Sequence, residues 1–277
     1  MEALQIYPDI DVSPIGFGHD RAKQDEMEST WCGIQVLERY VAIESGPYQQ
    51  PFAGPRSESY NSLTKPTMCM TQWRRTGQAG LVSTVARFPE ASYLLDKVYT
   101  ALNSPTAELA FNIEEISLTV QTLSNLQTIL LDETGDGIPL YTVGLTFCNT
   151  ALLLAFESGS KMPPSASSIE NVNQIATESL VSMLSSITSV VEPFTAGTQL
   201  DFNLLPPFTM FLVYKAASLV TERLLMEGDS AEENLKKLRI LRGFLQVAGE
   251  RWLGCKRFLD LLDEDTTPRI LKAIKQA

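Results

Sequence analysis

Three carboxylates lie close together in the stretch from Asp132 to Asp136, which reads Asp-Glu-Thr-Gly-Asp. Carboxylate oxygens are ligands that Ca²⁺ and Mg²⁺ prefer. A calcium loop of the EF-hand type that opened at Asp132 would need a carboxylate at its twelfth position, where the chain has Val143. The EF-hand interpretation therefore fails, and a magnesium site is the one metal interpretation left for this stretch.

The same spacing, Asp-Glu-x-x-Asp, resembles the magnesium-binding box of terpene cyclases, which are also acidic all-α proteins. Such enzymes hold a diphosphate through Mg²⁺ and clustered carboxylates. The resemblance requires a second metal motif that opens with Asn-Asp, and this pair does not occur in the chain. Gly135 also interrupts the helix that would present Asp132, Glu133 and Asp136 side by side. We therefore predict a polar turn at the end of a helix, with a Mg-dependent all-α enzyme of terpene-cyclase type as the alternative.

No other set of residues predicts catalysis. His19 is the only histidine, and its Gly-containing surroundings offer no partner that would orient it. Ser158 and Lys161 match the pattern Ser-x-x-Lys, which is too short to indicate an enzyme by itself. Asp260 and the acidic residues 263–265 are predicted to be solvated and to help end a helix. We therefore expect that the protein is not an enzyme, with no catalytic residue and no metal ligand in this chain.

Charge is unevenly distributed along the 277 residues, which carry a net charge of −11. Between Pro105 and Tyr214 the only basic residue is Lys161, against eleven Asp and Glu residues. A surface of this kind repels phosphate. We therefore expect DNA contact only through residues that lie outside this chain.

The cysteines do not have the spacing of a metal site. Cys32, Cys69, Cys148 and Cys255 are far apart, and no Cys-x-x-Cys pair occurs. A structural zinc site or a redox motif needs cysteines at short spacing, so zinc is not expected as a cofactor of this chain. We predict buried, reduced thiols in an intracellular protein. The first residues also lack the apolar segment of a signal peptide.

Hydrophobic spacing predicts helices along most of the chain and no convincing strand. Pro206 and Pro207 suit the first turn of the helix that follows them, and Ser230 with Glu233 forms a capping box. Residues 138–156 carry no charge, but their length is marginal for crossing a membrane, and we predict a central buried helix without membrane contact. The predicted helices are 23–45, 88–102 with Pro89 at its start, 104–132, 138–156, 167–191, 208–226, 230–262 and a short one from 267.

The fold class that follows is all-α, a multi-helix bundle or array. We divide the chain into an irregular lead-in over 1–22, a single all-helical domain over 23–265 and a short C-terminal helix over 266–277. Within the domain, residues 47–77 form a long polar connection rich in Pro, Ser and Gly.

Three stretches resemble the middle homology region of fungal transcription factors of the binuclear zinc cluster class. The first runs from Trp31 to Arg39 and is similar to the family signature Trp-x-x-x-x-x-Leu-Asp-Arg…Gly, with Glu38 in place of Asp. Residues 89–98 are similar to the helix that follows. The segment 205–262 is similar to a closing hairpin with a Pro-Phe entry, an Ala-Ala pair, a turn and a Leu-rich helix. The residues that carry the resemblance are Trp31, Glu38, Arg39, Gly46, Pro207, Phe208, Ala216 and Ala217.

The resemblance implies structural roles for these residues: Trp31 on a buried helix, and Arg39 with its acidic neighbour tying helices together. It also implies that 23–265 is the regulatory domain of a transcription factor that acts on RNA polymerase II transcription in the nucleus, in which a small molecule or a protein partner controls activity. Zinc and DNA contact would belong to an N-terminal cysteine cluster that this chain lacks.

The expected partners are another protein or a second copy of the chain, together with a small-molecule effector. A pocket is expected between 138–156 and 208–226, the two most apolar predicted helices, because bundle cores host ligands. The first half of the family's helical region is missing, so an apolar face around the helix of Trp31 is expected to be exposed and to seek a partner. A ligand-free dimerising adaptor is therefore a further alternative.

Overall fold

The computed structural model describes residues 30, 33–34, 36–44, 81–103, 109–135, 137, 139, 142–162, 167–197, 201–226 and 231–265. Over these residues every regular element is a helix, which confirms the predicted all-α fold. The predicted lead-in 1–22, the connection 47–77 and the terminal helix 266–277 lie outside them. Residues 36–44 are helical and are called helix 36–44 below. The further elements are α4 (Leu81–Asn103), α5 (Leu109–Thr134), α6 (Val143–Ser160), α7 (Ser167–Thr195), the 3₁₀ turn η2 (Phe202–Leu204), α8 (Phe208–Met226), α9 (Ala231–Ala248) and α10 (Gly254–Asp265).

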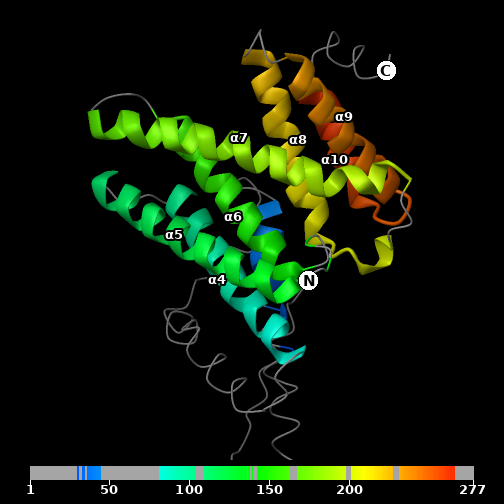
Figure 1. Ribbon diagram of the computed structural model, residues 1–277, viewed down its shortest axis with the longest axis horizontal. Helices are drawn as coiled ribbons and strands as arrows, with labels where there is room; N and C mark the ends of the chain where they lie inside the picture. Colours follow the sequence, from blue (N-terminus) through cyan, green and yellow to red (C-terminus); the bar gives the residue numbers. More distant parts are fainter. Residues whose placement is uncertain are drawn as a thin grey trace, which may run out of the picture.

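Helix α6 lies at the centre of the fold, between the pair α4 and α5 and the helices that follow it (Figure 1). It packs against α4, α5, α7 and α8. Its uncharged first turns put Leu145, Cys148 and Leu152 in the core. The helix begins at Val143 rather than at the predicted 138, because Thr142 has an extended backbone (φ −94°, ψ 110°). Among the helices placed in the structure, none combines the length and apolar character that a membrane crossing needs.

Close packing of α6 against α7 depends on a glycine. A Cβ atom on Gly159 would lie 2.8 Å from the Cβ atom of Ala176 in α7. That distance is shorter than two carbon atoms tolerate, since their optimal separation is about 3.5–4.0 Å. The missing side chain at Gly159 and the small one at Ala176 therefore bring the two helix backbones together.

Helix α8 has the predicted bounds, Phe208–Met226. The carbonyls of Pro206 and Pro207 accept the amides of Thr209 and Met210 at 3.0 and 3.2 Å, and so continue the helical hydrogen bonding back into the two prolines. α8 packs against α9, and its Ala-Ala pair, residues 216–217, is completely buried. The small side chains let α8 lie deep in the core.

The prediction of one helix over 230–262 is wrong. α9 ends at Ala248 and α10 begins at Gly254. The amide of Trp252 donates to the carbonyl of Ala248 at 2.8 Å, which closes the end of α9. The bend lets α10 pack against both α8 and α9, with Phe258 and Leu262 buried. Apolar spacing did not reveal the bend, because two successive helices have the same period as one long helix.

The prediction that Pro89 begins a helix is also wrong. α4 begins at Leu81, and Pro89 lies inside it. Proline has no amide proton for the carbonyl four residues earlier. The residues that follow it, including Ala91, Leu95 and Val98, are buried in the core, and tertiary packing of this kind outweighs local propensity. In α7 the helix likewise extends to Thr195, beyond the predicted end at 191 and past Pro193.

Candidate functional site

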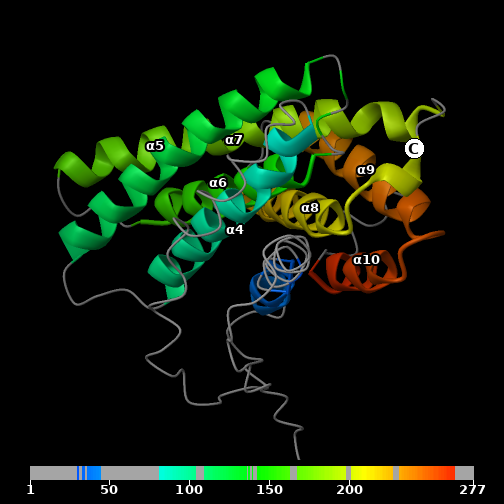
Figure 2. The same cartoon turned by 90° about the horizontal axis from the view of Figure 1, so that it is seen from below.

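A cleft of about 630 Å³ opens between α6 and α8, where the sequence predicts a pocket. α4 contributes Tyr99 and Leu102 to its wall, and helix 36–44 contributes Ile43. Figure 2 shows helix 36–44, in blue, beside α8. Clefts that bind small organic molecules have volumes of about 300–1,000 Å³. The cleft is therefore the candidate binding site.

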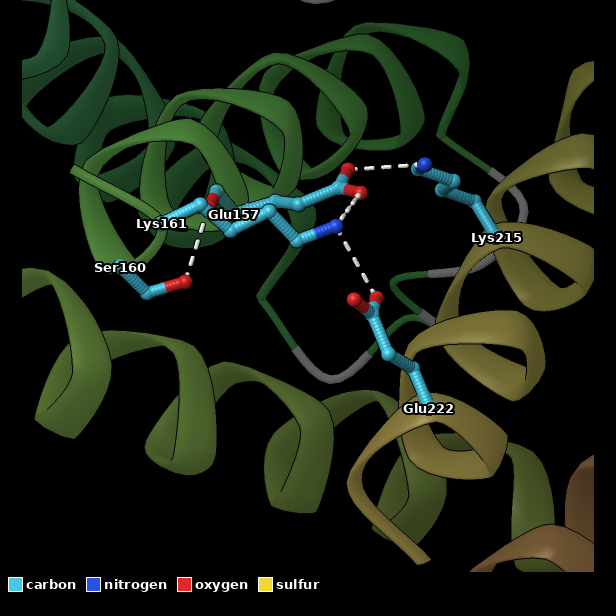
Figure 3. A network of polar contacts seen from close by, with 5 residues as sticks. All are labelled: Glu157, Ser160, Lys161, Lys215 and Glu222. Carbon is cyan, nitrogen blue, oxygen red and sulfur yellow. Dashed lines mark hydrogen bonds and ion pairs between the residues drawn. The ribbon is translucent and has the colours of Figure 1, made fainter. Parts of the chain in front are cut away.

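Four charged side chains form a continuous series of ion pairs at this cleft (Figure 3). The Nζ atom of Lys215 lies 2.8 Å from Oε2 of Glu157. The Nζ atom of Lys161 lies 3.0 Å from Oε1 of the same carboxylate and 3.0 Å from Oε2 of Glu222. Three of the four residues line the cleft, and Glu222, on α8, lies outside its wall. The series joins the C-terminal end of α6 to the middle of α8.

The ion pairs determine the protonation states of Glu157 and Lys161. Burial by itself would raise the pKa of Glu157, but the ammonium groups of Lys215 and Lys161 outweigh it and hold that pKa below its ordinary value. Partial burial disfavours the charged form of Lys161, whereas its hydrogen bonds to Glu157 and Glu222 raise its pKa overall. Both groups are therefore charged at neutral pH. A protonated Lys161 does not accept a proton from Ser158, which argues against a Ser–Lys nucleophile pair here.

The remainder of the cleft wall is mainly aromatic and aliphatic, with Asn103, Ser158 and Ser218 as uncharged polar residues. The rings of Phe211 and Tyr214 have centroids 6.2 Å apart. Tyr214 also stacks on Phe258 of α10, with centroids 4.7 Å apart and planes 12° apart. α10 thus supports one face of the Tyr214 ring. A pre-formed aromatic wall with a few convergent charges is typical of a small-molecule site.

Side-chain contacts hold helix 36–44 against the cleft. The Nε atom of Arg39 lies 3.9 Å from Oδ2 of Asp96, and its guanidinium lies 5.9 Å from the centroid of the Tyr93 ring, both on α4. Tyr40 meets the edge of Phe208 on α8 at 4.6 Å between centroids. The hydroxyl of Tyr99, whose pKa is raised by burial, donates to the carbonyl of Ala42 at 3.4 Å. Helix 36–44 therefore bridges α4 and α8.

The residues of the family resemblance lie around the cleft and not in it. Arg39 contacts Asp96 of α4, whereas Glu38 is exposed. Ala216 and Ala217 are buried in the core. Trp31 and Gly46 lie outside the described residues, so their predicted roles stay predictions.

Pro207 and Phe208, the remaining residues of the resemblance, start α8. Pro207 is exposed. Phe208 is half-buried between Tyr40 and Phe147, whose ring centroid lies 4.8 Å away. The Pro-Phe entry therefore fixes the first turn of α8 against both helix 36–44 and α6.

The two described carboxylates of the acidic stretch at the end of α5 lie on the surface of that helix. Asp132 and Glu133 are exposed, and Glu133 Oε1 lies 3.7 Å from Nε of Arg87. Gly135 has φ +54° and ends the helix, as predicted. Asp136 lies outside the described residues. No group of three or more possible metal ligands occurs in the part of the chain that the structure describes.

The second acidic stretch contains an ion pair that the sequence analysis missed. Asp263 of α10 pairs with Nη2 of Arg242 in α9, whose side chain is 6% exposed. Among the described residues, the Nε and Nη1 atoms of Arg242 find no hydrogen-bond acceptor. Asp263 is exposed, as predicted for this cluster, and it also compensates a buried guanidinium.

Part of the cleft could be read from the sequence. Glu157 and Lys161 have the i, i+4 spacing of a helical ion pair, and Lys215 is the single cation in the first three turns of α8. The contact between Lys215 and Glu157 joins residues far apart in sequence, and no local pattern indicates it. The contributions of α4 and helix 36–44 were missed for the same reason.

Comparisons with protein-family models, with curated proteins and with solved structures found no match to this chain. The family resemblance therefore rests on the residues named above.

Proposed function

We propose that this chain is an effector-binding regulatory domain, of the kind that controls fungal transcription factors of the zinc cluster class in the nucleus. The observation that carries the proposal is the cleft between α6 and α8. It is large enough for a small organic molecule, has an aromatic wall and contains charges that are already paired with one another. Zinc and DNA contact would come from residues outside this chain.

The geometry favours binding over catalysis. Lys161 and Lys215 neutralise Glu157 and Glu222 within the series of ion pairs, so neither Glu157 nor Lys161 is poised as a general base or a nucleophile. The contacts of Arg39 and Tyr40 hold helix 36–44 against α4 and α8, two of the helices that line the cleft. A ligand that touches Ile43 would strengthen the docking of this helix, which is a way to turn binding into a signal.

The experiment is a thermal-unfolding screen of the purified chain with organic metabolites. A ligand that binds only the folded state stabilises it by about 2.7 kcal/mol at a concentration 100 times its Kd. We expect stabilisation of the wild type and its loss in Ser218→Trp, which fills the cleft. Ser182→Trp, on the exposed side of α7, is the matched control. A metabolite that stabilises wild type and Ser218→Trp equally, or the absence of any shift across the screen, would argue against the proposal.

A second candidate, a dimerising adaptor, is favoured by one feature. Ile34, Leu37 and Val41 are 43%, 52% and 55% exposed, and their spacing of three and four residues is that of a coiled-coil seam. A second copy of the same helix would cover this row. Sedimentation of the wild type and of Leu37→Glu/Val41→Glu distinguishes the two functions. A dimer that the double variant dissociates would favour the adaptor, and a wild type that stays monomeric would exclude it.

A further inference from the structure

The basic residues of the middle of the chain are gathered at the cleft. Lys161 and Lys215 are the only Lys or Arg residues from 105 to 222 in a chain whose net charge is −11. Both line the cleft, where Glu157 is the single acidic residue of the wall. Glu222, outside the wall, lies 3.0 Å from Lys161, so the four charges of the series sum to zero. The wall itself presents both ammonium groups and one carboxylate to the cleft, and an ammonium group that keeps free N–H donors can still bind an anionic acceptor.

Hydrogen-bond donors remain at Lys215. An ammonium group has three N–H donors. Lys215 gives one of them to Glu157, at 2.8 Å, and its side chain is 22% exposed. In the described part of the chain no other acceptor is found for it, so two donors are left for solvent or a ligand. A carboxylate on a ligand would meet Lys215 in a charge-assisted hydrogen bond, which is stronger than a bond between neutral groups.

Much of the rest of the wall is apolar. Its surface comes from Ile43, Leu102, Leu154 and Phe211, together with the ring of Tyr214. Such a surface favours the hydrocarbon part of a ligand, because water leaves both surfaces when they meet.

The charges at the lysines restrict the charge of the ligand. Glu157 lies next to both lysines, and it would repel a group with two negative charges. A cationic ligand would meet two ammonium groups.

We propose that the ligand is an amphipathic monocarboxylate, with its carboxylate on Lys215 and Lys161 and its aromatic or aliphatic body against Phe211, Tyr214 and Leu154. This inference rests on the proposed effector-binding function and names the ligand class for the same cleft. The carboxylate adds an acceptor to the existing series of ion pairs and leaves the pairing of Glu157 in place.

Isothermal titration calorimetry with matched acids and amides tests whether the ligand is a monocarboxylate. The probes are 2-naphthoate against 2-naphthamide and decanoate against decanamide, which differ in charge and hardly in shape. We expect at least one of the two acids to bind, at one molecule per chain, and its amide to bind at least about tenfold more weakly. Equal binding of acid and amide would overturn the proposal, and so would the absence of binding by both acids.

Two variants with opposite expected effects on affinity distinguish the loss of a charged contact from general damage to the fold. Lys215→Met should weaken binding of the acid about tenfold or more and leave the amide unchanged. Glu157→Gln removes the competing carboxylate and should strengthen binding of the acid. Lys236→Met, at a side chain 72% exposed on α9, is the control and should change neither. Weaker acid binding in Glu157→Gln, or an unchanged affinity in Lys215→Met, would overturn the proposal.

The screen with Ser218→Trp distinguishes failure of this inference from failure of the proposed function. A neutral or cationic metabolite that stabilises the wild type and not Ser218→Trp leaves the cleft as an effector site and refutes the monocarboxylate. If neither the probes nor any metabolite binds in the cleft, both proposals fail.

Discussion

The Nζ atom of Lys215 lies 2.8 Å from Oε2 of Glu157, and this contact joins α8 to α6 across the rim of the cleft. The Glu157 side chain is 16% exposed, whereas most charged pairs on protein surfaces lie in water and contribute little. Removing one partner leaves the other charge partly buried and without compensation.

Glu157→Gln should lower the free energy of unfolding by about 1–3 kcal/mol at pH 7. Because the pKa of Glu157 lies below its ordinary value of 4.5, its stabilisation is present above about pH 4.5 and is lost as pH falls through the lowered pKa. Urea unfolding of wild type and variant at pH 7 and pH 3 measures this. Glu233→Gln is the control, since Glu233 pairs with Lys237 at 2.7 Å but is 70% exposed. A difference for Glu157→Gln that persists unchanged at pH 3 would contradict the ion-pair explanation.

Asp263→Ala should destabilise the protein by about 1–3 kcal/mol, because the buried guanidinium of Arg242 loses its partner. Arg242→Met/Asp263→Ala should recover part of this loss, since replacing both members of a buried pair removes the uncompensated charge. Chemical unfolding of the single and double variants checks the sign. A double variant that is less stable than Asp263→Ala would contradict this explanation, because it would show that the unpaired guanidinium of Arg242 does not destabilise the protein.

Arg39→Met should loosen helix 36–44, because it removes the contacts to Asp96 and Tyr93. We expect faster hydrogen exchange of the amides in 36–44 with little change in α6. Glu38→Gln, at the exposed neighbour, should leave the exchange rates as they are. Equal protection of helix 36–44 in Arg39→Met and wild type would show that Tyr40 and Tyr99 hold this helix alone.

Cys148 and Cys255 should be unreactive in the folded protein. Burial raises the pKa of Cys148 to about 12, with a contribution from the charge of Glu90, and raises the pKa of Cys255 to about 11. Because the thiolate is the nucleophile, iodoacetamide at pH 8 should modify both at least about tenfold more slowly than a free cysteine. A Cys32→Ser/Cys69→Ser variant followed by mass spectrometry isolates the two thiols. Modification that is equally fast with and without urea would refute the prediction.

Gly159→Ala should destabilise the protein by about 1–3 kcal/mol, because the added Cβ would lie 2.8 Å from that of Ala176. Gly159→Ala/Ala176→Gly relieves the overlap and should recover much of the loss. Gly243→Ala is the control: its Cβ would meet Thr195 at 3.5 Å, an ordinary contact, so the helix preference for alanine should stabilise it by about 0.5–1 kcal/mol. Thermal unfolding of the three variants distinguishes overlap from helix propensity.

Local signals predicted those elements whose ends are set by local chemistry. Pro206 and Pro207 fixed the start of α8, and Gly135 fixed the end of α5. Where tertiary packing decides, prediction failed. Pro89 lies inside α4, because the residues after it are buried in the core. The bend between Ala248 and Gly254 is set by what α10 packs against.

The candidate site also has features that the local sequence predicts and features that depend on tertiary packing. The position of the cleft between α6 and α8 could be predicted, because two strongly apolar helices are expected to pack against each other in a compact fold. Its chemistry did not follow, because Glu157 and Lys215 meet only after both helices are placed. The exposed row of Ile34, Leu37 and Val41, in contrast, is an apolar face that the sequence predicts around helix 36–44.

The central position of α6 has a consequence for the folding pathway. Two of its neighbours, α4 and α5, precede it in the chain, and α7 and α8 follow it. Much of the core is therefore built from segments close together in sequence, which corresponds to a low relative contact order and to rapid folding. We expect the transition state for folding to contain α6 with its sequence neighbours, and the junction with α8, which carries the cleft, to consolidate late.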